Sequence, residues 1–206
     1  MSQGARTARS GSAAGSTTPP RRVRIIGGAW RRTPIPVADV PGLRPSPDRV
    51  RETLFNWLAH LRPDAQALRG LDLFAGTGAL GFELASRGAV RVVLVERQPK
   101  LLQQLRAVQA RLEASQVEII PGEALAVAAG LAPASFDIVF LDPPFDAGLL
   151  WPAIEAAFPL LAAGGLIYAE SDLPIAPADA AVHGLELVRS ARAGRVCFHL
   201  LQPRIA

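Results

Sequence analysis

The sequence is poor in cysteine and has no long apolar run. Its single cysteine, Cys197, excludes a disulfide within the chain and a zinc site built from several cysteines. No stretch approaches the ~20 apolar residues that a membrane-spanning helix requires. The first residues are small and polar and lack the apolar segment of a secretory signal. We therefore expect a cytoplasmic protein without membrane association.

The sequence does contain enough apolar residues for one domain. At 206 residues, half of them hydrophobic, the chain is long enough to bury one sizeable core. The three histidines have no spacing typical of a metal site, and no Ser/His/Asp arrangement is visible. We expect a monomer without a bound metal.

Positive charge is concentrated at one end of the chain. The first 62 residues contain 11 arginines and three acids, a net charge of +8, whereas residues 63–206 carry −4. All but one of the 22 basic residues are arginine, which biased codon usage could explain, but such a bias does not place the charge at one end. A basic N-terminal third beside a mildly acidic remainder predicts contact with a polyanion, which we interpret as nucleic acid.

The basic third begins with a polar segment and a predicted hairpin. Residues 1–22 lack apolar periodicity, which predicts a disordered tail. Residues 23–37 predict a β-hairpin with a glycine pair near its bend. Arg31 and Arg32 beside Trp30 could meet phosphate and a base. Alternatively, Trp30 packs inward on a solvated edge hairpin.

A helix is predicted after the hairpin. Ser46 is a suitable N-cap, and Pro47 suits the first helical position. Apolar residues at helical spacing predict one buried face, formed by Val50, Leu54, Trp57, Leu58 and Leu61. Arginines around the start of this helix predict a binding surface, formed by Arg44, Arg49 and Arg51. We therefore predict a nucleic-acid-binding extension over residues 23–62 and a core over residues 63–206.

In the core, short apolar runs alternate with helical patterns. The predicted strands are 70–74, 91–96, 117–120, 136–141 and 165–170, and the predicted helices are 78–88, 98–113, 124–130 and 149–161. Continuous apolar runs suit parallel strands that are covered on both faces. Two further runs, 185–191 and 195–201, predict a terminal hairpin that makes one edge of the sheet antiparallel. The prediction is an α/β fold with a seven-stranded, mostly parallel sheet.

The first core strand is followed by a glycine-rich loop. Residues 71–81 read Leu-Asp-Leu-Phe-Ala-Gly-Thr-Gly-Ala-Leu-Gly, with glycines at 76, 78 and 81. Glycines permit a tight turn and close approach of a ligand to the backbone. Glu96 ends the next strand, where its carboxylate can accept both hydroxyls of a ribose. A tight turn without a ligand is the alternative, and the two features fit NAD and S-adenosylmethionine (SAM) alike.

A second loop distinguishes these two ligands. The run after the fourth strand resembles the Asp/Asn-Pro-Pro-Tyr/Phe loop of SAM-dependent amino-methyltransferases, with Asp142, Pro143, Pro144 and Phe145. The Asp142 carboxylate and the Pro143 carbonyl can accept hydrogen bonds from the two N–H groups of an exocyclic amine. The prolines stiffen the loop, and Phe145 can stack on a base splayed out of its helix or loop. An ordinary turn after a strand is the alternative.

With these motifs in view, residues 23–202 resemble one family, the bacterial 16S ribosomal RNA guanine-N2-methyltransferases known as RsmD. The resemblance is carried by the Arg-Ile-Ile-Gly-Gly run at 24–28, the more family-specific block at 44–56, the glycine loop and the Asp-Pro-Pro-Phe loop. Pro47 departs from the family, which usually has Thr or Ser there. Glu123 stands where many relatives place Asp or Asn against the adenine.

The resemblance implies a Rossmann-like fold and SAM-dependent methylation of the N2 amine of a specific guanine in 16S rRNA, free or in the assembled 30S subunit. The implied catalytic residues are Asp142, Pro143, Pro144 and Phe145. The implied SAM contacts are Asp72, Phe74, Ala75, Gly76, Thr77, Gly78, Glu96, Arg97, Glu123, Ala124 and Asp142. RNA is expected to contact Trp30, Arg31, Arg32, Arg44, Arg49 and Arg51.

Other functions explain only part of the sequence. A nicotinamide-dependent dehydrogenase would share the glycine loop and Glu96 but would leave the Asp-Pro-Pro-Phe loop and the basic extension unexplained. A non-catalytic RNA-binding protein would need no acid at position 142. An adenine-N6 methyltransferase acting on DNA or RNA would share the loop. Such enzymes usually carry a separate target-recognition region, for which 206 residues leave little room.

Overall fold

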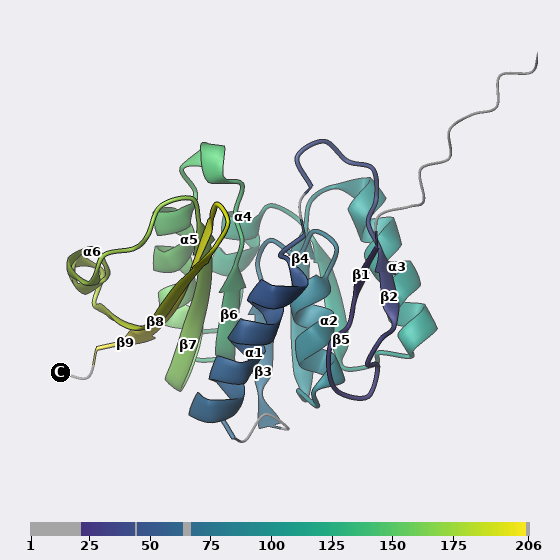
Figure 1. Ribbon diagram of the computed structural model, residues 1–206, viewed down its shortest axis with the longest axis horizontal. Helices are drawn as coiled ribbons and strands as arrows, with labels where there is room; N and C mark the ends of the chain where they lie inside the picture. The colour runs from purple at the N-terminus through teal and green to yellow at the C-terminus, as the bar shows by residue number, and fades with distance from the viewer. Residues whose placement is uncertain (1–21, 44, 64–66, 205–206) are drawn as a thin grey trace, which may run out of the picture.

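The computed structural model describes residues 22–43, 45–63 and 67–204 and contains a seven-stranded sheet between two layers of helices (Figure 1). The strand order is β5-β4-β3-β6-β7-β9-β8. The first five of these are mutually parallel: β3 (Arg69–Asp72), β4 (Arg91–Glu96), β5 (Val117–Pro121), β6 (Phe136–Leu141) and β7 (Leu161–Ser171). The last two form the predicted antiparallel hairpin: β8 (Leu185–Ala193) and β9 (Val196–Pro203). The predicted fold class is thus confirmed.

Six α-helices in the described residues cover the sheet. One layer is α1 (Asp48–Leu61), α2 (Ala79–Ser86) and α3 (Pro99–Leu112), and the other is α4 (Ala124–Ala129), α5 (Leu150–Ala157) and α6 (Pro177–Val182). Each layer has its own apolar cluster, because alternate residues of the buried strands face opposite sides of the sheet. No helix in the described ranges is long and apolar enough to cross a membrane.

The longest apolar runs were predicted best. Strands β4 and β6 begin and end at the predicted residues, 91–96 and 136–141. The predicted helix 149–161 instead gives way to a 3₁₀ turn at Phe158–Leu160, and β7 begins at Leu161 rather than 165. Residues 162–165 are Ala-Ala-Gly-Gly, which carry little strand signal, although they extend β7 in the structure. The short helix α6 was not predicted.

The N-terminal hairpin is present, and its connection is hydrogen-bonded to α2. Strand β1 (Arg22–Arg24) pairs antiparallel with β2 (Pro34–Pro36), and residues 25–33 form a longer connection than the predicted bend. The Glu83 carboxylate accepts hydrogen bonds from the backbone N–H groups of Ile26 at 2.6 Å and Gly27 at 2.8 Å. Gly28 has a φ of 76°, and a Cβ there would lie 1.9 Å from the Ser86 carbonyl oxygen, so only glycine fits. Of the predicted tail, only Arg22 is among the described residues.

Helix α1 buries the predicted face, but its start differs from the prediction. Val50, Leu54 and Leu58 are buried, and Trp57 and Leu61 pack against the same cluster. The prediction that Ser46 caps the helix is wrong, because Pro47 immediately precedes the helix and no side chain caps it. The Ser46 hydroxyl turns instead toward a buried carboxylate of the sheet.

Candidate active site

Four acids lie at the carboxyl ends of four adjacent parallel strands. Glu96 ends β4, Asp72 ends β3, Asp142 follows β6, and Glu170 is the penultimate residue of β7. In open α/β sheets, ligands bind beyond the carboxyl ends of the strands where the strand order reverses direction. Here that point lies between β3 and β6, so the predicted glycine loop and Asp-Pro-Pro-Phe loop are neighbours.

Glu96 is joined to the glycine loop. One oxygen of its largely buried carboxylate accepts a 2.9 Å hydrogen bond from the Gly76 N–H, and the other accepts from the N–H groups of Arg97 and Gln98 at 2.8 Å. Gly76 and Gly78 have φ angles of 53° and 78°, in the region that favours glycine. The carboxylate is therefore held beside the loop, with acceptor capacity remaining for hydroxyl donors.

Asp72 is a buried acid without a hydrogen-bond partner. Neither carboxyl oxygen receives a hydrogen bond of ordinary geometry in the described residues, and the side chain is almost fully buried. Burial raises the pKa of Asp72 to about 7, against the opposing influence of the Gly81 and Phe74 backbone N–H groups, and the charges of Glu96 and Glu170 raise it further. A cationic ligand group would supply the hydrogen-bond partner that this carboxyl lacks.

Asp142 contacts a hydroxyl that bridges it to Glu170. The Ser46 hydroxyl lies 2.5 Å from Glu170 Oε1 and 3.5 Å from Asp142 Oδ2, and the Tyr168 hydroxyl donates to Glu170 Oε1 at 2.8 Å. Burial raises the pKa of Asp142 well above its usual range, and the charges of Glu170 and Asp72 add to the effect, while Ser46 opposes it. Burial also raises the pKa of Glu170, against the hydroxyls of Ser46 and Tyr168.

The Asp-Pro-Pro-Phe loop is fixed at its start and open at its end. Pro143 is buried, whereas Pro144 and the Phe145 ring, which is 39% exposed, face solvent. A small cavity of about 40 Å³ lies between this loop and the end of β7, and Glu170 is part of its lining. Phe145 is thus available to a flat ligand near Asp142.

The remaining predicted SAM residues line the same edge of the sheet. Arg97 and Glu123 form an exposed ion pair of 3.0 Å between the ends of β4 and β5, and Ala124 begins α4 next to it. Glu123 thus already has a partner in this structure. The others belong to the glycine loop and follow β3: Phe74, Ala75, Thr77 and Gly78.

The predicted RNA-binding residues do not share one environment. Arg31, Arg32 and Arg49 are exposed, whereas Trp30 is partly buried against the core, as the alternative reading of the hairpin predicted. Arg51 does not project from the helix as predicted: its side chain is fully buried and is hydrogen-bonded to Asp48 at 2.6 Å. Arg44 lies outside the described residues.

Three residues of this site were not predicted from the sequence: Ser46, Tyr168 and Glu170. A signal for Glu170 was present, because it ends the predicted strand 165–170 just as Glu96 ends 91–96. Tyr168 is two residues before it and therefore points to the same face of the strand. Ser46 had only a local signal, that of a helix cap, which indicated a different role.

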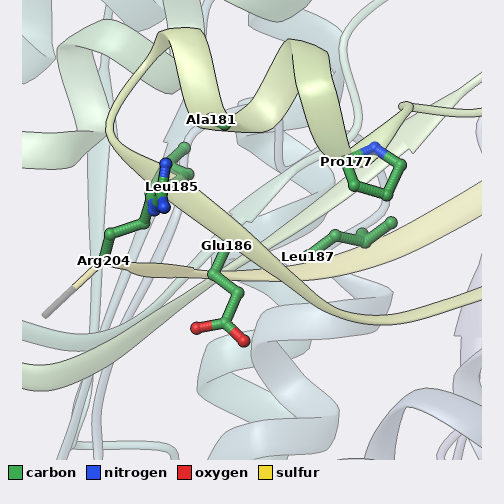
Figure 2. A pocket seen from close by; sticks show the side chains of 6 residues that line it. All are labelled: Pro177, Ala181, Leu185, Glu186, Leu187 and Arg204. Atoms are coloured by element: carbon green, nitrogen blue, oxygen red, sulfur yellow. The ribbon is translucent and has the colours of Figure 1, made fainter.

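A larger groove lies away from these residues. It has a volume of about 590 Å³ and lies between α6 and the start of β8, where it is lined by Pro177, Ala181, Leu185, Glu186, Leu187 and Arg204 (Figure 2). None of the predicted site residues lines it. The chemistry of the strand-end acids therefore belongs to a different part of the molecule.

Comparisons with known proteins agree with this arrangement. A family model described as conserved hypothetical protein 95 matches residues 23–202. Ribosomal RNA small subunit methyltransferase D from Escherichia coli (strain K12) is 44% identical over 187 residues, 88% of this chain and 90% of that protein. Its namesake from Haemophilus influenzae is 41% identical over 155 residues, 73% of this chain and 79% of that protein.

A solved structure shows the same fold. The structure described as the putative methyltransferase yhhF from Escherichia coli matches with a TM-score of 0.76 and 41% identity, over 90% of this chain and all of that chain. The predicted family resemblance is therefore confirmed over nearly the whole described chain. The protein belongs to the RsmD family of methyltransferases.

Proposed function

We propose that the protein transfers a methyl group from SAM to the exocyclic N2 amine of a guanine in 16S ribosomal RNA. The names of its relatives, ribosomal RNA small subunit methyltransferase D, support the substrate class. The observation that carries the proposal is the proximity of two loops at neighbouring strand ends: the glycine loop with Glu96, and the Asp142 loop suited to an amine. A protein with this substrate would act in the cytoplasm, where ribosomes assemble.

The residues at the strand ends suit SAM. Glu96 has acceptor capacity for the ribose hydroxyls, and its bonds to backbone N–H groups keep it in place. Asp72 is buried and has no well-formed hydrogen bond within the described part of the chain, so it suits the positively charged amino group of the ligand. When bound, SAM supplies a methyl group attached to a positively charged sulfur, which is a good leaving group because it becomes neutral when the methyl group is transferred. Glu123 and Ala124 would lie near the adenine.

Asp142 and Pro143 would orient the amine. An exocyclic amine on a purine is a poor nucleophile because its lone pair is delocalised into the ring. Hydrogen bonds from its two N–H groups to the Asp142 carboxylate and the Pro143 carbonyl would fix it with the lone pair directed at the methyl group. Such alignment can account for much of the rate, and the fixed charge of the carboxylate favours the positive charge that develops on nitrogen.

Phe145 and the basic extension would hold the RNA. The exposed Phe145 ring can stack on a guanine splayed out of its helix or loop. We propose that residues 23–62 are an RNA-binding extension of a core over residues 63–206, with Arg31, Arg32 and Arg49 among its exposed cations. Arginine is suited to this role because its planar guanidinium binds phosphate oxygens in pairs.

The test is methyl transfer from radiolabelled SAM to 30S subunits from cells that lack the modification, compared with the naked rRNA. Digestion and mass spectrometry of the nucleosides would identify the product. We expect N2-methylguanosine at one site. N6-methyladenosine would instead favour the adenine-specific alternative. Calorimetric titration with SAM and NADH provides an independent check, since binding of NADH alone would contradict the proposal.

A further inference from the structure

Glu170 is the one acid at the strand ends that the proposed function leaves without a role. Its side chain is 2% exposed and lies on the strand next to the one that precedes Asp142. Two hydroxyls converge on its Oε1 atom, from Ser46 at 2.5 Å and from Tyr168 at 2.8 Å. A buried carboxyl is costly, and this one is retained beside the amine-binding loop.

The direction of the hydrogen bonds links Glu170 to Asp142. A serine hydroxyl has one proton to donate and two lone pairs. The shorter contact favours donation of the Ser46 proton to Glu170 Oε1, which leaves the serine lone pairs to accept from another donor. Asp142 Oδ2 lies 3.5 Å from the same oxygen and becomes such a donor when it is protonated. Contacts of this kind often tighten when substrate is bound.

We propose that Glu170 acts through Ser46: it fixes the Ser46 hydroxyl beside the Asp142 carboxyl and takes up the proton that the methylated amine must lose. This inference rests on the proposed function, because it concerns the fate of a proton in that reaction. It also explains why the Ser46 side chain turns into the site instead of capping α1.

The proton that the methylated amine loses ends on Glu170. Methylation leaves the amine nitrogen with its two N–H bonds, a new carbon and a positive charge. One N–H bond breaks, its electron pair stays on nitrogen, and the proton passes to Asp142 Oδ2. Asp142 then donates this proton to Ser46 Oγ while Ser46 passes its own to Glu170 Oε1. The amine loses one proton, Glu170 gains one, and Asp142 and Ser46 are restored.

A route to solvent begins at Glu170. The cavity of about 40 Å³ between the Asp-Pro-Pro-Phe loop and the end of β7 is lined in part by Glu170, Ser171 and Asp172. A volume of this size can hold a water molecule. The proton can therefore leave Glu170 through this cavity, beside the Asp-Pro-Pro-Phe loop, after which Glu170 is ready for the next turnover.

The charged neighbours of Glu170 set the expected pH dependence. Asp142 and Asp72 are the acids that interact with it, and the Tyr168 hydroxyl stabilises its charged form. Burial raises the pKa values of Asp142 and Glu170 above their usual range, and the charges of Glu170 and Asp72 raise that of Asp142 further. Activity should therefore decline as pH falls through the apparent pKa of the coupled pair, since protonated carboxyls cannot accept a further proton.

The experiment compares kcat against pH for the wild type, Glu170→Gln and Tyr168→Phe on 30S subunits. Glutamine keeps an acceptor oxygen for both hydroxyls but takes up no proton. We expect kcat to fall about 100-fold, the lower end of the range for proton transfer by a positioned group. The pH at which kcat falls to half on the acid side should be lower in this variant, because Asp142 loses a negative neighbour. In Tyr168→Phe this pH should be higher, because Glu170 loses a donor.

Variants at Ser46 test whether its hydroxyl links Asp142 to Glu170. Ser46→Ala should lower kcat as much as Glu170→Gln, the double variant should be no worse than either, and Ser46→Thr should recover most of the rate because it keeps the hydroxyl. Glu186→Gln is the matched control, since Glu186 is exposed on β8 with its carboxylate directed away from α6 (Figure 2). A wild-type pH profile in Glu170→Gln would overturn the inference.

A measurement without turnover keeps the two proposals separate. Carbon-13 NMR of the side-chain carboxyls in the free protein should show Asp142 titrating at lower pH in Glu170→Gln than in the wild type. An unchanged Asp142 titration would refute the coupling even if the enzyme is active. A wild type that methylates no ribosomal RNA would refute the proposed function, and the NMR titration would still decide whether Glu170 acts on Asp142.

Discussion

The guanidinium of Arg51 lies 3.6 Å from the carboxylate of Glu83, and both side chains are fully buried. Arg51 belongs to α1 and Glu83 to α2, so this ion pair joins the proposed extension to the proposed core. The same carboxylate accepts from two backbone N–H groups of the hairpin connection. A single side chain of the core thus holds both parts of the extension.

Loss of this carboxylate should release the extension. We expect Glu83→Ala to lower the free energy of unfolding by about 3–5 kcal/mol, since it leaves the buried guanidinium with Asp48 alone and removes the acceptor of two backbone N–H groups. Urea unfolding measures the effect, and limited proteolysis should show cleavage between residues 25 and 33. Glu118→Ala is the control, because Glu118 pairs with Arg91 at the surface, where ion pairs contribute little. Equal stability of the two variants would contradict this role of Glu83.

Glu96→Ala should weaken SAM binding by about 1.5–3 kcal/mol, the range for hydrogen bonds to a charged group. The loss has two sources, since the ribose loses its acceptor and the Gly76 N–H loses the bond that holds the loop. Calorimetry with SAM measures the change. Glu123→Ala should lose less, because Glu123 is exposed and paired with Arg97. Unchanged SAM affinity in Glu96→Ala would refute the assignment.

Asp142→Ala should nearly abolish turnover while the protein stays folded and bound to RNA. The carboxylate orients the amine only when the base is in place, and the substitution removes an acid that repels Glu170 and Asp72, so the protein should stay folded. The measurements are single-turnover methyl transfer and filter binding of RNA. Activity within a few-fold of the wild type would rule out the proposed role.

Asp72 should make the free protein less stable as pH rises. The unfolded chain has the ordinary aspartate pKa of 3.8, whereas the folded protein has a value of about 7. The stability associated with the protonated carboxyl is complete below the lower value and lost as pH rises toward the higher one. Asp72→Asn should therefore be more stable than the wild type by at most about 4 kcal/mol at about pH 8, with a smaller gain at about pH 5.

Thermal unfolding at the two pH values checks this prediction. Titration with SAM then tests the proposed contact between Asp72 and the ligand. The asparagine variant should bind SAM more weakly, since the amide carries no charge for the amino group of the ligand. A gain in stability that does not depend on pH would show that the Asp72 carboxyl is not the titrating group.

Replacing Arg31 and Arg32 by alanine should make RNA binding less sensitive to salt. Each phosphate contact contributes roughly 0.7–0.9 to the slope of log K against log salt, so the slope should flatten by about 1–2 if both touch phosphate. SAM affinity should barely change. Arg189→Ala with Arg192→Ala is a control that removes two exposed arginines from β8. An unaltered slope in the first variant would exclude the hairpin from the RNA site.

The sequence predicted best what depends on strand patterns. Continuous apolar runs located β4 and β6, and parallel strands bring their carboxyl ends together, so the approach of Glu96 to Gly76 followed from the topology. The Asp142 loop was located in the same way. These features depend on short-range patterns and on a rule that holds for every parallel sheet.

The errors concern polar side chains with distant partners. Arg51 lies on the same face of the helix as Leu54, Phe55 and Leu58, and this position indicates burial. Arginine is seldom buried, however, and the partner Glu83 lies 32 residues away in the chain. Ser46 obeyed the local rule for a helix cap, yet its hydroxyl bonds Glu170, 124 residues later. Local patterns carry no information about such partners.

The two outermost strands of the sheet bear on self-association. An exposed strand edge can pair with another chain, and charged side chains or bulges discourage such pairing. Strand β8 carries Glu186, Arg189 and Arg192, and its pairing with β9 shifts register between residues 187 and 189. Strand β5 is five residues long, includes Glu118 and ends at Pro121, which has no N–H to offer. Both edge strands therefore disfavour pairing with the strands of another molecule, and the protein should not aggregate through its sheet at high concentration.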